Sequence, residues 1–424
     1  MDKLKIRLLA VASLVACGAT ADVPYVTGVS LDPGSGSREA TVTYTLHNAP
    51  AVITFDIQTN VTVGGVTTWA SIGANHLAYV SPDSATFRKV DADGTYTIRW
   101  SANDDTCNFS IGGNGTRAVV TAWAIDDTPD YMVVNLASNT TTHASVRYYP
   151  SVDHLPGGIL SNLGYRTSLL VMRRIHARGV PWTMGSVAEA GREATRETTH
   201  TVTLTNDYYM AVFPFTQSQY YLVSKAMPSY FTQVRFRTLR PVEKVNWNTA
   251  ITFLTNTLSA KTGLDFTLPG EAQWEFAARA GNGERRWGDG SRQSSTNIPG
   301  RCQSTGGYPS VGDENYGNTS TNAWTAVNGT AECGSYAPNA WGLYDMCGNV
   351  AEWCLDWYIA DISGLGGAVI TDGFPGASDS SKVCRGGTFE MHWTMLRPAR
   401  RDMSAWISDW RTRGFRPVCR AGLK

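Results

Sequence analysis

The chain has 424 residues, enough for two or three domains, and its 42% hydrophobic and 11% aromatic content can fill packed cores, which excludes an intrinsically disordered protein. Lysine plus arginine (36) balances aspartate plus glutamate (36), and no basic run occurs. This balance excludes electrostatic attraction to nucleic acid or to an anionic membrane surface, so we expect no nucleic-acid partner.

The N-terminus predicts export. Three basic residues among the first seven precede an apolar run over 8–16, which is too short to cross a bilayer and is typical of a signal peptide. Two cleavage sites are compatible with residues 1–21. The sequence at 19–21 (ATA) fits an ordinary signal peptidase, whereas 14–17 (LVAC) resembles a bacterial lipobox, in which Cys17 would be lipidated. We therefore expect a periplasmic, extracellular or lipid-anchored protein that contacts the membrane only through such an anchor.

Residues 23–145 predict an all-β sandwich of the immunoglobulin or fibronectin type. Apolar and polar residues alternate in short stretches that are separated by Gly-, Pro- and Asp-rich turns. These stretches are 40–46, 51–57, 95–100 and 117–123. Cys107 is the single cysteine of this region, so an internal disulfide is impossible there. Residues 146–164 are expected to form a linker.

From residue 165 onward the pattern includes helices as well as strands. Residues 200–204 and 207–212 are typical of strands. Residues 248–262 carry apolar side chains at helical spacing, and a second helix is predicted over 268–281, with Pro269 near its start and glycine at its end. The sequence therefore predicts an α+β domain over 165–424.

Three motifs identify this second domain. Residues 339–353 read NAWGLYDMCGNVAEW, 385–388 read RGGT and 414–416 read GFR. Together they resemble the sulfatase-modifying-factor family, whose fold is that of the formylglycine-generating enzyme. The resemblance covers the chain from about residue 165 to its end. It implies a C-type-lectin-like α+β fold after the β-sandwich, in a multidomain chain.

The resemblance also implies a calcium ion in the first motif. A hard cation prefers oxygen ligands, and the family positions correspond here to the side chains of Asp345 and Glu352 and the carbonyls of Gly348 and Val350. In the alternative, these two carboxylates pair with Arg385 or Arg416 in a structural network.

A second family calcium site would use Asn297 and Ile298. The aspartate that completes this site in the family corresponds to Thr325 here, which puts the second site in doubt.

The oxidases of this family bind copper(I) through two cysteines just after the Arg-Gly-Gly turn. Those positions hold Met391 and Leu396, and neither side chain can form a thiolate. Copper bound by Met391, His392 and Met395 is an alternative with little support. The histidines show no paired spacing for the iron used by another family branch. We therefore expect neither copper nor iron and no formylglycine-generating activity, although the oxidoreductase ancestry leaves enzyme status open.

Two function classes follow. The first is a calcium-stabilised, lectin-like module that binds a peptide, a glycan or an exported protein. Its candidate groove is Phe389, Glu390, His392, Trp393, Arg400, Trp406, Asp409 and Trp410. Core packing is the alternative role of these tryptophans, and Trp353 and Trp357 are expected in the core. The second class is a metal-dependent oxidase of the formylglycine-generating or non-haem-iron type, acting on an exported sulfatase or another substrate.

Six cysteines of the second domain could form disulfides in an exported protein. They are Cys302, Cys333, Cys347, Cys354, Cys384 and Cys419. Cys384 and Cys419 flank the second and third motifs, so we expect them to pair. A thiolate metal site of Cys347, Cys354 and Cys384 is an alternative without a spacing signature.

Overall fold

The structure is a computed structural model that describes residues 22–33, 39–77, 87–101, 115–138, 146–232, 237–294, 297–299, 329–372 and 380–422. The signal segment with Cys17, the two cysteines Cys107 and Cys302, and Thr325 lie outside these residues. No helix within the described ranges combines the length and the apolar character needed to cross a membrane.

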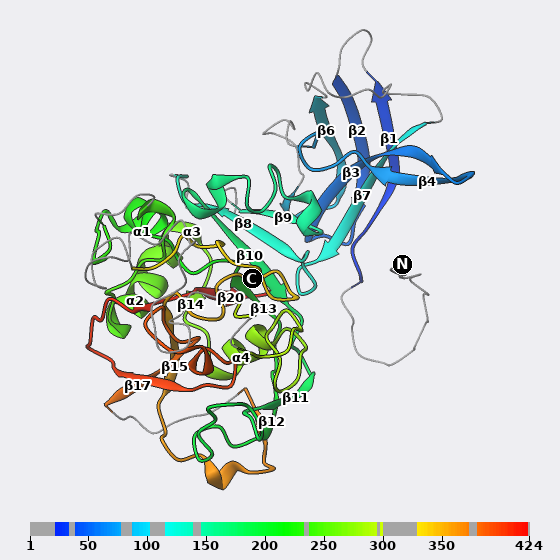
Figure 1. Ribbon diagram of the computed structural model, residues 1–424. Coiled ribbons are helices and arrows are strands. Elements are labelled where there is room, and N and C mark those ends of the chain that lie inside the picture. The colour runs from blue at the N-terminus through cyan, green and yellow to red at the C-terminus, as the bar shows by residue number, and fades with distance from the viewer. Residues whose placement is uncertain are drawn as a thin grey trace.

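Two sheets form the N-terminal part (Figure 1). One contains β1 (Tyr25–Pro33), β2 (Glu39–His47) and β6 (Gly94–Ser101). In the other, β3 (Ala51–Val63) pairs with β4 (Val66–Ser71), β5 (Arg88–Val90) and β7 (Thr116–Ala124). Strands β2, β3, β6 and β7 cover the four stretches predicted from alternation. Along β2 this alternation turns Val42, Tyr44 and Leu46 into the core, as the period of two requires.

A six-stranded sheet joins the N-terminal part to the rest of the chain. Its order is β14 (Phe266–Thr267), β20 (Val418–Arg420), β13 (Tyr208–Ala211), β10 (Leu169–Ile175), β8 (Tyr131–Asn135) and β9 (Val146–Tyr149). β8 falls in the range expected for the sandwich and β9 in the range expected for the linker, and both pair into this sheet. Tyr131 and Val133 of β8 also pack in one core cluster with Val42 and Val171. The two predicted domains therefore share a sheet and a core.

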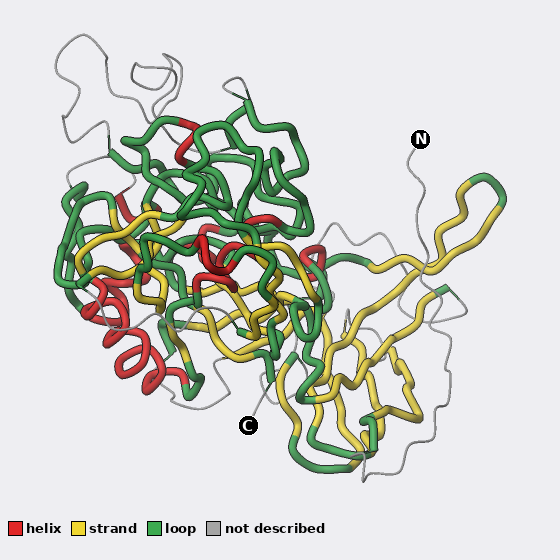
Figure 2. Tube along the Cα trace, turned by 90° about the horizontal axis from the view of Figure 1, so that it is seen from below, coloured by secondary structure: helices red, strands yellow, loops and turns green. Residues whose placement is uncertain are grey.

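Two further sheets and several short helices complete the C-terminal part, where loops predominate (Figure 2). One sheet has β11 (Pro181–Met184), β12 (His200–Thr203) and β16 (Val369–Thr371). The other has β18 (Asp402–Ala405), β17 (Ser381–Arg385), β15 (Ala351–Trp357) and β19 (Arg413–Gly414). The 3-10 turns are Val152–His154, Leu163–Arg166, Arg237–Leu239, Ser363–Leu365 and Trp393–Met395.

The helices begin and end where local chemistry places their caps. α1 (Gln217–Ser224) starts with a capping box of Thr216 and Gln219. The helix predicted at 248–262 is continuous, as α2 (Trp247–Thr252), a π-helical stretch (Phe253–Leu258) and α3 (Ser259–Thr262), and Gly263 ends it at φ 73°. α4 (Glu271–Arg279) lies inside the predicted 268–281.

The predicted disulfide between Cys384 and Cys419 is wrong. Cys384 and Cys419 are both buried free thiols. Cys384 lies in β17 opposite Trp353 and Asp402, whereas Cys419 lies in β20 of a different sheet. Apolar burial, rather than a covalent bond between them, holds these two cysteines. Burial also raises the pKa of the Cys384 thiol to about 12, which opposes the alternative thiolate metal site.

Candidate functional site

The loop of the first motif bends back on itself. Asp345, Gly348 and Asn349 have left-handed backbones, at φ 57°, 86° and 67°. The amide of Gly348 donates to the carbonyl of Gly386 at 2.7 Å, so the first motif contacts the second directly. The side chain of Asn349 accepts from the amide of Ala331 at 2.9 Å and donates to its carbonyl at 3.2 Å. These bonds fix the course of the loop and join the first motif to the second.

Glu352 forms the structural ion pair that was the alternative to its calcium role. Its Oε1 accepts from Arg416 Nη2 at 2.8 Å, and its Oε2 accepts from Trp274 Nε1 at 2.7 Å. Arg416 is fully buried and also donates to three main-chain carbonyls, those of Ala211, Val212 and Tyr344. Arg385 does not join this pair. It lies beside Glu271 and Glu275 instead.

Asp345 is the residue of the loop that suits a cation. Its Oδ2 accepts from the amide of Gly334 at 2.7 Å, and its buried Oδ1 has no hydrogen-bond partner in the part of the chain that the structure describes. Burial, the largest cause, raises the pKa of this carboxyl to about 6. A buried acceptor without a partner is costly, and a calcium ion would satisfy it.

The second calcium position has less capacity for a metal. Asn297 Oδ1 already accepts from Ser294 Oγ at 2.6 Å and lies 3.4 Å from the donor Trp287 Nε1. Ile298 packs against an apolar cluster. Thr325, the position of the missing aspartate, lies outside the described residues.

That apolar cluster includes positions 391 and 396, where the family resemblance implies the two cysteines of the oxidases. Its buried members are Trp287, Cys347 and Leu396, and Met391, Trp393 and Ile298 pack against it. His392 precedes the 3-10 turn, and its Nδ1 accepts from the amide of Thr394 at 3.4 Å. Among the residues with described positions, no group of three His, Cys, Asp or Glu side chains could hold a metal ion.

Some of the eight candidate groove residues are packed inside the protein, and the others lie at or near its surface. Phe389 and Arg400 are buried: Phe389 packs edge-on against Phe231 at 5.6 Å, and Arg400 pairs with Glu193. Trp393 belongs to the apolar cluster described above. These three side chains therefore pack inside the protein and stabilise the segment 389–400.

The other members lie closer to solvent. Glu390 forms an ion pair with Arg411 at 3.1 Å, and Asp409 is exposed. Trp406 and Trp410 are 38% and 63% exposed. These two rings therefore lie at the surface and not in the core, and their role as groove residues stays a prediction.

Two further apolar residues, which the sequence reasoning missed, join these tryptophans on one chain segment. Met403 in β18 is 46% exposed, and Ile407 is 63% exposed. We call Met403, Trp406, Ile407 and Trp410 the aromatic patch. The only sequence signal for the additional residues is that four large apolar side chains occur within eight positions beside a motif. Isolated exposed apolar residues are ordinary, but a group of this kind marks a binding surface more often.

Buried arginines hold the segment before the aromatic patch in place, and sequence reasoning did not identify them. Arg397 donates to Glu189 and Glu197 at 2.7 Å, and all three side chains are fully buried. Arg401 pairs with Glu271 at 2.7 Å. The only sequence signal is the run of arginines at 397–401, because the acidic partners come from distant segments.

The fold and the site define a class: a β-rich chain whose C-terminal part is a loop-rich α+β domain built around the three motifs. The model of the sulfatase-modifying factor enzyme 1-like domain matches residues 173–421, which is more than half of the chain. The protein belongs to this family.

Two relatives are formylglycine-generating enzymes. That of Thermomonospora curvata is 32% identical over 155 residues, which cover 36% of this chain and 45% of the relative. That of Streptomyces coelicolor is 35% identical over 158 residues, which cover 36% of this chain and 43% of the relative. The matched part thus spans less than half the length of these relatives. Among solved structures, Treponema denticola variable protein 1 is 26% identical with a TM-score of 0.48, covering 59% of this chain and 95% of that chain.

Proposed function

We propose that this protein is an exported binding protein whose family domain recognises a peptide, a glycan or an exported protein and does not generate formylglycine. One observation carries the proposal: Met391 and Leu396 stand at the two cysteine positions, within an apolar cluster. Leucine offers no ligand atom, and a thioether cannot become a thiolate nucleophile or ligand. A domain without this pair keeps the fold and loses the known basis of the reaction.

The aromatic patch supports a binding role. Indole rings present a large flat surface that packs against apolar side chains or sugar faces, and the indole N–H adds a polar contact. The patch begins within β18, where Met403 pairs with Val383 of β17, so a sheet positions its first residue. The buried ion pairs of Arg397 and Arg401 restrain the segment that leads into β18, and restraint lowers the entropy lost on binding.

Removing the two patch tryptophans tests this role. We expect Trp406→Ala with Trp410→Ala to lower binding to peptide and glycan arrays at least tenfold, while the free energy of unfolding changes by less than about 1 kcal/mol because both rings are substantially exposed. Trp69→Ala is the matched control, since Trp69 is also 38% exposed but lies in the N-terminal part. Unchanged array binding together with lower stability would assign the rings to packing and remove the proposal.

The alternative function is a metal-dependent oxidase that acts on an exported sulfatase. It is favoured by the two relatives that are named formylglycine-generating enzymes. We expect no product when the purified mature protein is incubated aerobically with copper(I), a reductant and a peptide containing Cys-x-Pro-x-Arg, as followed by mass spectrometry. A two-cysteine family member is the positive control. Formylglycine that disappears in Met391→Ala would establish the oxidase instead.

The proposal includes a structural calcium ion at the loop of the first motif. The Asp345 carboxylate would hold it together with the carbonyls of Gly348 and Val350, while Glu352 stays paired with Arg416. Calcium at 100 times its Kd would stabilise the protein by about 2.7 kcal/mol. We expect Asp345→Asn to abolish the rise in melting temperature on calcium addition, and Asp361→Asn, at an exposed carboxylate, to retain it. An equal rise in both variants would place the ion elsewhere.

Export and domain organisation complete the proposal. The signal-like segment 1–21 supports a periplasmic, extracellular or lipid-anchored location, with the membrane reached only through lipidated Cys17. The N-terminal β-sandwich would present the family domain to its ligand, which could include a sulfatase. Intact mass of the processed protein separates the two forms: a chain starting at Asp22 eliminates the lipid anchor.

A further inference from the structure

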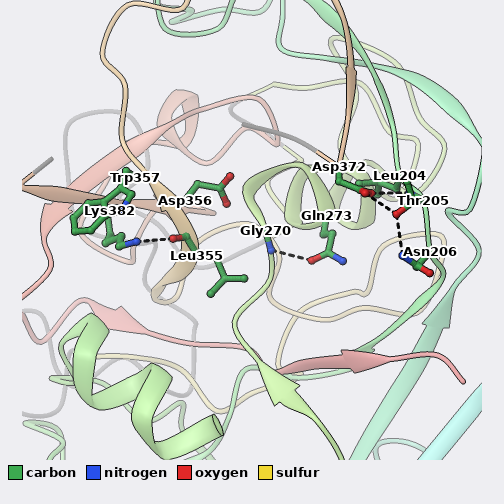
Figure 3. A pocket seen from close by; sticks show the side chains of 10 residues that line it. All are labelled: Leu204, Thr205, Asn206, Gly270, Gln273, Leu355, Asp356, Trp357, Asp372 and Lys382. Carbon is green, nitrogen blue, oxygen red and sulfur yellow. Dashed lines mark hydrogen bonds between the residues drawn. The ribbon is translucent and has the colours of Figure 1, made fainter. Parts of the chain in front are cut away.

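An open cavity of about 420 Å³ lies between the sheets of the C-terminal part and the start of α4 (Figure 3). It shares no residue with the calcium loop or with the aromatic patch, and the proposed function does not use it. Its lining comes from five separate segments: Leu204, Thr205, Asn206, Gly270, Gln273, Leu355, Asp356, Trp357, Asp372 and Lys382. Because these segments are distant in sequence, only the folded chain assembles the cavity.

Two carboxylates of the lining are held in place by hydrogen bonds. Asp356 Oδ2 accepts from the amide of Glu271, at the first residue of α4, at 2.6 Å. Asp372 accepts from the amide and from the hydroxyl of Thr205, each at 2.6 Å. Neither Asp356 nor Asp372 forms an ion pair within the described part of the chain. Burial, followed by repulsion from Glu271, raises the pKa of Asp356 to about 6, so a nearby cation would stabilise its charged form.

Lys382, the one cation of the lining, is already engaged. Its Nζ lies 4.1 Å from the ring centre of Trp247 and 3.7 Å from that of Trp357, and the two rings stack at 6.5 Å. The same Nζ donates to the carbonyl of Leu355 at 2.7 Å. Burial lowers the pKa of Lys382 to about 8. Asp356 attracts Lys382 and Arg401, but Lys382 is also engaged by two indoles and a carbonyl, and Arg401 is paired with Glu271. The lining itself holds two carboxylates and one cation, which leaves it with a net negative charge.

We infer that this cavity binds a small organic cation, a guanidinium or primary ammonium group, through Asp356 and Asp372. Charge complementarity favours a cation over an anion or a neutral ligand. The carboxylates retain acceptor capacity beyond the amide and hydroxyl bonds that orient them, and charge-assisted bonds to such groups are the stronger ones. Asn206 and Gln273 add amide groups that can contact the rest of the ligand.

The probe is Nα-acetyl-L-arginine methylamide, and its matched neutral control is the citrulline analogue, which has nearly the same shape and lacks the charge. We expect calorimetric titration of the mature protein to show binding of the arginine probe that is at least tenfold tighter than binding of the citrulline probe, a difference of about 1.4 kcal/mol. Asp356→Asn is expected to weaken the arginine probe at least tenfold, because the asparagine oxygen can still accept from Glu271. Asp361→Asn, at an exposed carboxylate outside the cavity, is expected to leave it unchanged.

Asp372→Asn provides a second test if Asp356→Asn does not fold. Asp372 is exposed, so replacing its carboxylate is expected to change the free energy of unfolding little, and it should weaken binding of the arginine probe. Equal affinity for both probes, no detectable heat with either, or full binding by the two cavity variants would overturn the inference. Binding of methyl α-glucoside in place of the arginine probe would also overturn it and would assign the cavity to a neutral sugar. Array binding in the tryptophan variants reports on the aromatic patch, and the titration with the arginine probe reports on the cavity. The proposed function and this inference can therefore be rejected separately.

Discussion

Arg416→Met is expected to lower the free energy of unfolding by about 3–5 kcal/mol, because removing one partner of a buried ion pair leaves the other charge uncompensated. Glu352 would keep the indole N–H of Trp274 and lose the guanidinium. Three main-chain carbonyls, of Ala211, Val212 and Tyr344, would lose their donor at the same time. Urea denaturation followed by tryptophan fluorescence measures the loss.

Arg420→Met is the matched control, because Arg420 is exposed in β20 and lies only four residues further along the chain. Its stability is expected to stay within about 0.5 kcal/mol of the parent. The double variant Arg416→Met with Glu352→Leu should recover part of the loss, since an apolar pair of similar volume can replace a buried ion pair. A loss below about 1 kcal/mol for Arg416→Met would show that the pair is not a main support of the motif.

Gly387→Ala is expected to cost about 2–5 kcal/mol. The backbone of Gly387 has φ 70°, which costs an L-residue about 1–2 kcal/mol. A Cβ atom there would lie 2.6 Å from Leu396 Cδ2 and 2.8 Å from the carbonyl oxygen of Met395, and overpacking adds about 1–3 kcal/mol. The change would also displace Leu396 within the apolar cluster. Thermal and urea unfolding both measure the loss.

Gly367→Ala separates the two contributions. Gly367 has nearly the same φ, 74°, and a Cβ atom there would meet nothing within 4 Å. It should therefore show the backbone cost alone, about 1–2 kcal/mol. Equal losses at Gly387 and Gly367 would mean that the close approach of the second motif to Leu396 contributes nothing.

Several local features followed from the sequence, because they depend on neighbouring residues. The alternating stretches at 40–46 and 51–57 are strands, and the helical spacing of 248–262 forms a continuous helix with its π-helical centre. The glycines of the second motif permit a close approach to α4: a Cβ atom on Gly386 would lie 3.1 Å from the Trp274 ring. Arg416 is paired with a carboxylate, which was the stated alternative to calcium, and the neighbouring Phe415 is in the core.

Other predictions depended on contacts between distant segments, and several of these were wrong or incomplete. The Cys384–Cys419 disulfide was placed by sequence adjacency to motifs, but the two strands belong to different sheets. Trp357 was expected in the core, and it is only partly buried, beside Lys382 in the wall of a cavity. Phe389, a predicted groove residue, is buried.

By itself, the sequence determines the family motifs and the absence of cysteine at positions 391 and 396, and it predicts an export signal, because each is a matter of residue identity at a known spacing. Tertiary structure alone decided which carboxylate Arg416 meets, which tryptophans reach solvent and which charges share a cavity. Those properties arise where segments far apart in the chain come together, as when Glu189 meets Arg397 across 208 residues. A periodic pattern constrains one element at a time, whereas the energy of a buried charge depends on every element packed around it.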